Sequence, residues 1–197
     1  MSSLDLHGCD KEDKLIFPED EQPFSLNSNP LLFFSDYARE RPLVVDRNMQ
    51  ALEAKRILRS SRVSSCVVVN RKSEFIGILV LEDLSAQEIM KKQASGMMRT
   101  DITVNDFYRP REKMYAIDYS ELTRSKIIDV IRVLQRFGQK YCLVTDRVNH
   151  NLRGILSAEH IAKKLKIDMQ DDRAINFYEI FKTIHENQLK PGSAAGG

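Results

Sequence analysis

An internal repeat restricts the fold of this chain more than any other feature of its sequence. Residues 51–70 (ALEAKRILRSSRVSSCVVVN) align without a gap with residues 127–146 (IIDVIRVLQRFGQKYCLVTD). After one extra residue in the next loop the match continues, because residues 77–79 and residues 154–156 both read Gly-Ile-Leu. A match of this length with one insertion at a turn indicates that a structural unit has been duplicated.

Both copies predict the same order of elements. In the second copy, apolar residues from Ile127 to Phe137 recur at helical spacing, and Gly138 is placed to end that helix. In the first copy, Asn48 is the expected N-cap of the corresponding helix. A β-strand before this helix and two strands and a second helix after it make a β-α-β-β-α unit. The expected strands are 43–45, 66–69 and 75–79 in the first copy and 114–117, 141–144 and 152–156 in the second, and the second helices begin near Glu82 and Ala158.

A single unit of about 55 residues is too small to bury an adequate core alone, so two units are expected to pack through their sheets. The predicted class is therefore α/β (α+β), with two repeats related by pseudo-twofold symmetry. A further helix is expected over 168–190, with an apolar stripe of Ile175, Tyr178, Phe181, Thr183 and Ile184. The expected divisions are an acidic, flexible N-terminal segment (1–30), repeat 1 (31–98), repeat 2 (99–167), the C-terminal helix (168–190) and a flexible tail (191–197).

Charge is distributed unevenly along the chain. The whole sequence has 30 basic and 28 acidic residues and a net charge of only +2, so no global field favours nucleic-acid binding. Residues 1–24, however, carry seven acids against two lysines, a net charge of −5. This stretch is interpreted first as a solvated tail, and second as a docking segment for a basic partner.

The cysteines and the hydropathy pattern favour a cytoplasmic protein. The three cysteines have no metal-ligand spacing, and Cys66 and Cys142 lie in apolar runs where free thiols behave as small buried hydrophobes. The N-terminal residues do not resemble a signal peptide, and no apolar run approaches the ~20 residues of a membrane span. We therefore expect no membrane association.

The repeated pattern resembles the CBS domain over residues ~31–167. The family's motif, Gly-hydrophobic-x-Thr/Ser-x-x-Asp, is matched in part by residues 77–83 (GILVLED) and by residues 154–160 (GILSAEH). Residues 63–70 (VSSCVVVN) resemble the strand that follows the first helix in the family. Residues 103–110 (TVNDFYRP), echoed by residues 34–37 (FSDY), resemble the lead-in to a CBS copy.

The resemblance implies an adenine-nucleotide site in each cleft between the repeats. Gly77 and Gly154 would let backbone approach the ligand, the motif hydroxyl would bind phosphate at a helix N-terminus, and the motif carboxylate would bind the ribose hydroxyls. Each copy departs from this pattern in one place. The first keeps Asp83 but has Val80 in place of the hydroxyl, and the second keeps Ser157 but has His160 in place of the carboxylate. Each missing charge-assisted bond would cost about 1.5–3 kcal/mol.

Other side chains could compensate for these losses. Lys140 and Tyr141 precede the strand where ligands of the family often touch the chain, and Arg109 and Arg111 could reach a phosphate. The alternative interpretations are structural. Lys140, Tyr141 and the two arginines would be surface residues, Asp83 a first-turn acid that the helix dipole favours, Ser157 a plain N-cap and His160 a surface residue of a helix.

No catalytic machinery is recognisable, so we expect a protein that is not an enzyme. The sequence has no glycine-rich phosphate loop, no helix-spaced pair of histidines and no nucleophile elbow. Its basic runs lack interleaved aromatic residues, which argues against a nucleic-acid partner. The predicted function is a regulatory CBS pair that forms a homodimer, binds AMP, ADP or ATP and modulates an unknown protein partner. The alternative is a ligand-free scaffold that acts through homodimerisation and protein contacts.

Overall fold

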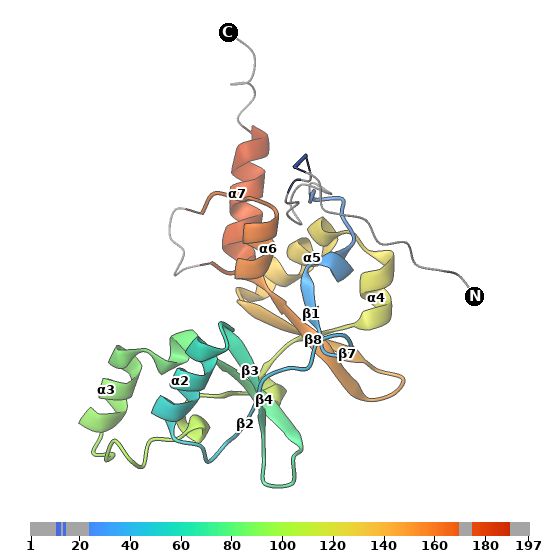
Figure 1. The fold of residues 1–197 in the computed structure, drawn as a ribbon. Coiled ribbons are helices and arrows are strands. Elements are labelled where there is room, and N and C mark those ends of the chain that lie inside the picture. The colour runs from blue at the N-terminus through green and yellow to red at the C-terminus, as the bar shows by residue number, and fades with distance from the viewer. Residues whose placement is uncertain (1–10, 13, 15–23, 170–174, 190–197) are drawn as a thin grey trace.

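The computed structural model describes residues 11, 12, 14, 24–169 and 175–189, and it contains two four-stranded sheets that face each other at the centre of the molecule (Figure 1). The first sheet has the strand order β2-β3-β4-β5, and the second has the order β1-β8-β7-β6. The strands are β1 (Phe34–Asp36), β2 (Val44–Asp46), β3 (Ser65–Val69), β4 (Phe75–Val80), β5 (Arg109–Pro110), β6 (Ala116–Asp118), β7 (Tyr141–Asp146) and β8 (Asn151–Ser157). The mixed α/β class is therefore confirmed.

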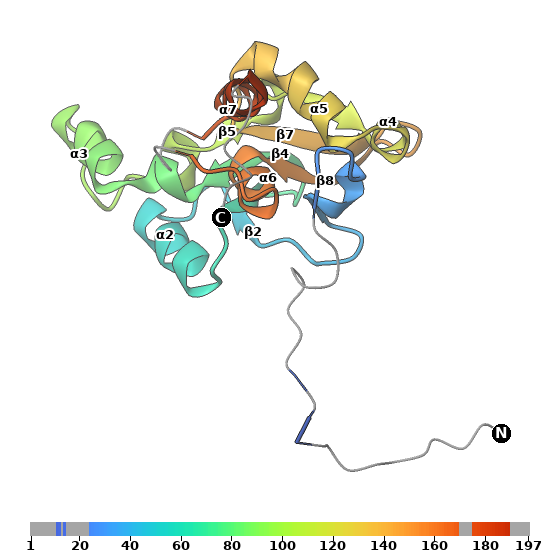
Figure 2. The same ribbon diagram turned by 90° about the horizontal axis from the view of Figure 1, so that it is seen from above.

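The two sheets share one topology and exchange one strand each. In both, a short strand runs parallel to the first strand of an antiparallel hairpin, as β2 does to β3 and β6 does to β7. The last strand of each sheet comes from the other repeat: β1 pairs with β8, and β5 pairs with β4. In Figure 1 the blue β1 lies beside the orange β8, from which it is distant in sequence, and Figure 2 shows the blue N-terminal residues next to β8 from above. Such reciprocal exchange is the pattern that a pseudo-twofold relation between the repeats produces, and it makes them one folding unit.

The exchanged strands explain the glycine that both motifs contain. A Cβ atom at Gly77 would overlap the carbonyl oxygen of Arg109 in β5, and a Cβ atom at Gly154 would overlap the carbonyl oxygen of Ser35 in β1. The glycines are therefore required by close approach of protein backbone, a role distinct from the ligand contact that the family resemblance suggested. The matching overlaps also establish Arg109 and Ser35 as equivalent positions.

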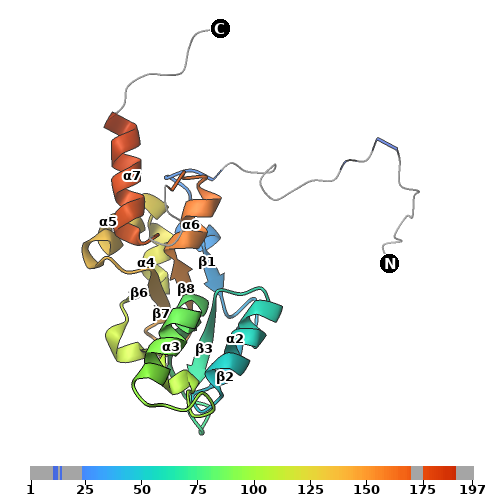
Figure 3. The same cartoon turned by 90° about the vertical axis from the view of Figure 1, so that its left-hand side faces the viewer.

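The helices largely follow the predicted order. They are α2 (Ala51–Ser60), α3 (Ala86–Ala94), α4 (Tyr119–Arg124), α5 (Ile127–Leu134), α6 (Ala158–Lys164) and α7 (Phe177–Leu189), and α2 and α3 form the helical layer of the first repeat (Figure 3). Gly138 has φ of 56° and ends the helical segment, as expected. Asn48 is not the N-cap of α2: Gln50 precedes the helix, and the Asn48 amide donates to Asp46 instead. The helix expected from Glu82 is a 3₁₀ turn (Leu81–Leu84), after which Ser85 caps α3.

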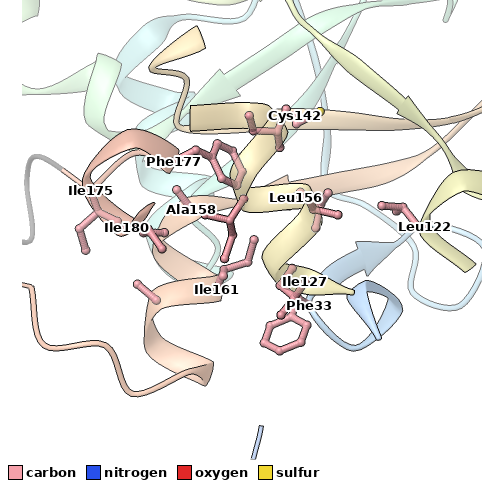
Figure 4. Close-up of a cluster of buried hydrophobic side chains, with 14 of the residues drawn as sticks. Phe33, Leu122, Ile127, Cys142, Leu156, Ala158, Ile161, Ile175, Phe177 and Ile180 are labelled. Atoms are coloured by element: carbon pink, nitrogen blue, oxygen red, sulfur yellow. The ribbon is translucent and has the colours of Figure 1, made fainter. Parts of the chain in front are cut away.

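Three apolar clusters hold these layers together. One lies where the two sheets meet and contains buried residues of both repeats, namely Val67, Ile78, Val80, Tyr141, Leu143 and Ile155. Each repeat also has a core between its sheet and its helices. Figure 4 shows that of the second repeat, where Phe33 from the N-terminal side lies next to Ile127 in the same cluster as Leu156. The buried Cys66 and Cys142 are free thiols, and burial raises the pKa of both to about 12.

The C-terminal helix starts later than the sequence suggested. Asp168 and Met169 are not helical, and α7 begins at Phe177. Its buried stripe is Phe177, Ile180 and Ile184, which packs on α5 and α6. Tyr178, expected in this stripe, is half-exposed because it lies about 100° around the helix from Phe177.

The expected tail (191–197) and most of the acidic segment lie outside the described residues. Within the described ranges no helix is long and apolar enough to cross a membrane.

Candidate functional site

Two equivalent clefts lie between the repeats, and we name each after the last residue of the motif that borders it. The Asp83 cleft joins the motif of repeat 1 to β5 and to the start of β7. The His160 cleft joins the motif of repeat 2 to β1 and to the start of β3. Equivalent backbone hydrogen bonds brace both: Leu81 N donates to Ser64 O over 2.8 Å, and Ala158 N donates to Lys140 O over 2.9 Å.

The Asp83 cleft is filled by side chains of the protein itself. Arg109 donates from Nε and Nη2 to the two carboxylate oxygens of Asp83, over 2.8 and 2.9 Å. Its guanidinium also lies 5.5 Å from the ring centre of Tyr141, a cation–π contact. Beside this pair, Lys140 Nζ donates to Glu82 over 2.7 Å. The hydrogen bond that Arg109 donates to Asp83 raises the pKa of the guanidinium, which stays charged.

The structure thus gathers Asp83, Lys140 and Tyr141 in one cleft, but Asp83 and Lys140 already have protein partners and the ring of Tyr141 is in contact with Arg109. Val80, the residue in place of the motif hydroxyl, is fully buried in the cluster between the sheets and cannot face a ligand. The sequence suggested that Arg109 could reach a phosphate. In the structure it donates instead to both carboxylate oxygens of Asp83, the group that would accept hydrogen bonds from the ribose hydroxyls.

The His160 cleft is open because its equivalent positions carry small side chains. Ser35 stands where the other cleft has Arg109, while Ser64 and Ser65 stand where it has Lys140 and Tyr141. The resulting cavity has a volume of about 270 Å³. It is lined on the polar side by Ser35, Glu40, Arg41, Arg62, Ser64 and His160 and on the apolar side by Pro42, Leu43, Val63 and Ile155.

His160 borders this cavity from the first turn of α6. Burial, together with the nearby charge of Lys164, lowers the pKa of its imidazole below the ordinary value of 6.5, so the ring is neutral at pH 7. Ser157 is the N-cap of α6, and its hydroxyl accepts from His160 N over 3.4 Å. The hydroxyl of the second motif therefore has the capping role that the structural interpretation assigned to it.

Asp36 is a cleft residue that sequence reasoning missed as a functional position. Its side chain is only 9% exposed, and both oxygens accept from Arg153, over 2.7 and 3.0 Å. Arg153 also lies over the ring of Tyr119. The hydrogen bond from Arg153 is the main reason that the pKa of Asp36 falls below 3.8. These two residues are 117 positions apart, so no local pattern could reveal the pair.

A second cavity of about 250 Å³ adjoins the first, and both are lined by Ser35, Asp36, Glu40 and His160. Lys164 lines only the second one, and burial lowers its pKa. Arg41 and Arg62 line the first cavity and Arg39 and Lys164 the second, whereas His160 lines both together with the acids Asp36 and Glu40.

A larger but shallow groove of about 990 Å³ lies along β6 and the β7–β8 hairpin, where Arg111, Asp118, Asp146 and His150 line it. No residue of either Gly-Ile-Leu motif lines this groove. Among the described residues no group of three or more His, Cys, Asp or Glu side chains could hold a metal ion.

Comparison with known families agrees with this architecture. Residues 34–89, which cover most of repeat 1, match the CBS domain. These residues are therefore similar to a CBS domain, and the two sheets with exchanged strands have the architecture of two similar repeats.

Solved structures show the same fold. An uncharacterized conserved protein from Pyrococcus horikoshii is 16% identical, with a TM-score of 0.53 over 75% of this chain and 99% of that one. A hemolysin-like protein containing a CBS domain, from Oenococcus oeni, is 14% identical, with a TM-score of 0.50 over 71% of this chain and 91% of that one. No curated protein sequence matches the chain.

Proposed function

We propose that this chain is a regulatory CBS module that binds one adenine mononucleotide in the His160 cleft and thereby changes its contacts with a protein partner. The observation that carries the proposal is the difference between two equivalent clefts. Arg109 fills the Asp83 cleft, whereas Ser35 leaves the His160 cleft open.

The lining of the His160 cleft offers a group for each part of a nucleotide. Arg41 and Arg62 would bind phosphate through charge-assisted hydrogen bonds. Leu43 and Val63 provide apolar surface for the base. Glu40 would accept from the ribose hydroxyls, the role of the carboxylate that His160 replaces. The cavity, at about 270 Å³, is near the lower end of ligand-pocket volumes, about 300 Å³, which favours AMP over ATP.

A ligand in this cleft would touch both repeats, because Arg62 comes from repeat 1 and His160 from repeat 2. It would therefore favour one relative arrangement of the repeats over others in a pre-existing equilibrium. A partner protein that binds one arrangement of the repeats more tightly would respond to this shift, and no chemical reaction is needed. Accordingly, we expect binding of the nucleotide without turnover.

Isothermal titration of the full chain with AMP, ADP and ATP tests the proposal. We expect one site per chain and tightest binding for AMP. Arg62→Gln should weaken AMP binding about ten-fold, the effect of losing one hydrogen bond to a charged group. Arg111→Gln, at an exposed arginine outside the cleft, is the matched control and should leave affinity unchanged. Absence of heat with all three nucleotides at millimolar concentration would refute nucleotide binding.

A scaffold without ligand is the second candidate, and one observation favours it. Tyr115 and Phe137 are exposed, with ring centres 4.1 Å apart and ring planes tilted by 33°, and Val133, four positions before Phe137, is exposed as well. Exposed apolar patches of this kind mark protein contacts. The homodimer predicted from the family would be seen as a doubled mass in sedimentation equilibrium.

A further inference from the structure

The shallow groove of about 990 Å³ along β6 and the β7–β8 hairpin lies apart from both motif clefts, and we call it the β6 groove. Phe75, Met114 and Leu152 line it, and all three pack, partly buried, against the apolar cluster between the sheets. Val148 also lines the groove and is 88% exposed. Apolar side chains that gather in an open groove are typical of an interaction surface.

The strand that borders this groove has a free edge. The outer side of β6 pairs with no other strand in the described part of the chain. On its inner side, Leu143 N donates to Tyr115 O over 2.9 Å, so the backbone of Tyr115 faces β7. Because successive residues of a strand turn their backbone groups to opposite sides, Ala116 turns its N–H and C=O toward the outer edge. Ala116 is exposed and lines the groove, and an edge of this kind is a template for an added strand.

The lining of the β6 groove is acidic on balance. Its charged residues are four acids against two arginines, a net charge of −2 with histidine counted as neutral, namely Glu112, Asp118, Glu121, Asp146, Arg111 and Arg147. Hydrogen bonds from Ser120 and from the backbone of Arg147 lower the pKa of Asp118, and hydrogen bonds from Asn149 lower the pKa of Asp146. Both carboxylates are therefore ionised at pH 7, and the groove favours a cationic occupant.

Cations around the groove leave this excess in place. Arg111 is paired with Glu112 over 3.2 Å and donates to Phe75 O over 3.1 Å. Arg153, whose charge interacts with Asp146, is bound by Asp36 through both of its donor nitrogens. Lys113 follows Glu112 in sequence but does not line the groove.

We propose that the β6 groove is the docking site for an extended basic segment of a partner protein, which adds a strand to the free edge of β6. Backbone groups of the segment pair with the N–H and C=O of Ala116. Every second side chain of the segment faces the groove, where lysine or arginine meets Glu121 and Asp146 and an apolar residue meets Val148. This docking is independent of whether a nucleotide binds in the His160 cleft.

Titration of the full chain with the capped peptide Lys-Thr-Val-Thr-Lys-Thr-Lys, followed by amide NMR, tests the docking. We expect binding at low salt and slowing of the exchange of the Ala116 N–H by about ten-fold or more, because that group becomes hydrogen-bonded. The peptide with Glu in place of each Lys should not bind. A version N-methylated at its three central residues keeps its charge, loses backbone donors and should bind about ten-fold more weakly.

Variants of the chain locate the peptide. Glu112→Gln/Glu121→Gln removes the net charge of the lining and should weaken binding about five- to ten-fold, the effect of two exposed ion pairs. The matched control Glu53→Gln/Glu186→Gln removes two exposed acids elsewhere and should bind like the wild type.

A second control addresses the acidic residues 1–24, which could also attract a basic peptide. The variant Glu19→Gln/Asp20→Asn/Glu21→Gln should bind the peptide as tightly as the wild type.

Four results would overturn the proposal. They are absence of binding at millimolar peptide, equal affinity of the wild type and the Glu112/Glu121 variant, equal binding of the N-methylated peptide, and binding that leaves exchange of the Ala116 N–H unchanged. Protection of this N–H that grows with protein concentration in the absence of peptide would also overturn it, because a second copy of the chain would then occupy the edge.

Discussion

Arg109 and Ser35 occupy equivalent positions on the two exchanged strands, opposite Ile78 and Ile155. In one cleft the long side chain reaches Asp83 and stacks on Tyr141, and in the other the short one leaves a cavity beside His160. Together with the smaller side chains of Ser64 and Ser65 in place of Lys140 and Tyr141, this difference separates an occupied cleft from an open one, although the strands around both pair in the same way.

The first prediction is that Arg109→Ser creates a second ligand site. The substitution copies the open cleft and frees both oxygens of Asp83, which could then accept from a ribose. AMP titration should change from one to two sites per chain. The loss of a partly buried bidentate pair should also reduce the free energy of unfolding by about 1–2 kcal/mol. An unchanged stoichiometry in a folded variant would show that Arg109 is not what closes the cleft.

The second prediction concerns the motif glycines. Gly77→Ala should destabilise the protein by about 3 kcal/mol or more, because its Cβ would meet the backbone of β5, which a side-chain rotation cannot relieve. Gly96→Ala has free space around its Cβ and should cost about 1 kcal/mol, through its φ of 95° alone. Urea denaturation measures both. Similar losses of unfolding free energy for the two variants would contradict the close approach of the Arg109 carbonyl in β5 to Gly77 in β4.

Comparison of expectation and structure shows where sequence reasoning succeeded. The repeat, the order of strands and the end of the helical segment at Gly138 follow from local patterns, and all three are present. Strand exchange could not be predicted, because β5 is only two residues long and its partner is chosen by tertiary packing. The ligand-binding role of the candidate site stays a prediction. The motif positions were found, but the pairing of Asp83 with Arg109 depends on which sheet β5 joins.

The third prediction is a pH dependence from Asp36. Its pKa in the folded protein is lowered, chiefly by the hydrogen bond from Arg153, so the pair stabilises the fold above the unfolded pKa of about 3.9. This stability is lost as the pH falls through the lower, folded pKa. Asp36→Asn should reduce the free energy of unfolding at pH 7 and flatten its decline in acid. Denaturation curves collected from pH 7 to about pH 2 give the free energy of unfolding of both proteins. If this free energy declines in parallel for wild type and variant, the Asp36–Arg153 pair is not the source of the pH dependence.

The fourth prediction separates the two faces of α7. Phe177→Ala should cost about 3–5 kcal/mol, because this fully buried ring packs against α5 and α6. Tyr178→Ala, one position along the same helix, changes a half-exposed side chain and should cost less than about 1 kcal/mol. Thermal unfolding of the two variants gives the comparison. Equal losses of stability for the two variants would contradict the finding that α7 buries Phe177 and exposes Tyr178.

The fifth prediction is that His160 makes phosphate binding dependent on pH. Its pKa is lowered by burial and by Lys164, so the ring gains its charge only below about pH 6.5, and the affinity for AMP should rise as the pH falls through that range. His160→Gln keeps a polar side chain that cannot be charged and should remove the rise. AMP titrations at about pH 5.5 and pH 8 measure the effect, and equal affinities in the wild type would exclude His160 from the site.

The central claim is that the protein holds one ligand, beside His160, and that Arg109 keeps the equivalent cleft closed. A crystal structure of the full chain grown with saturating AMP tests it most directly. The account predicts a nucleotide in contact with Arg41 or Arg62, with Arg109 still paired to Asp83. A nucleotide bound to Asp83 with Arg109 displaced, or none in either cleft, would contradict it.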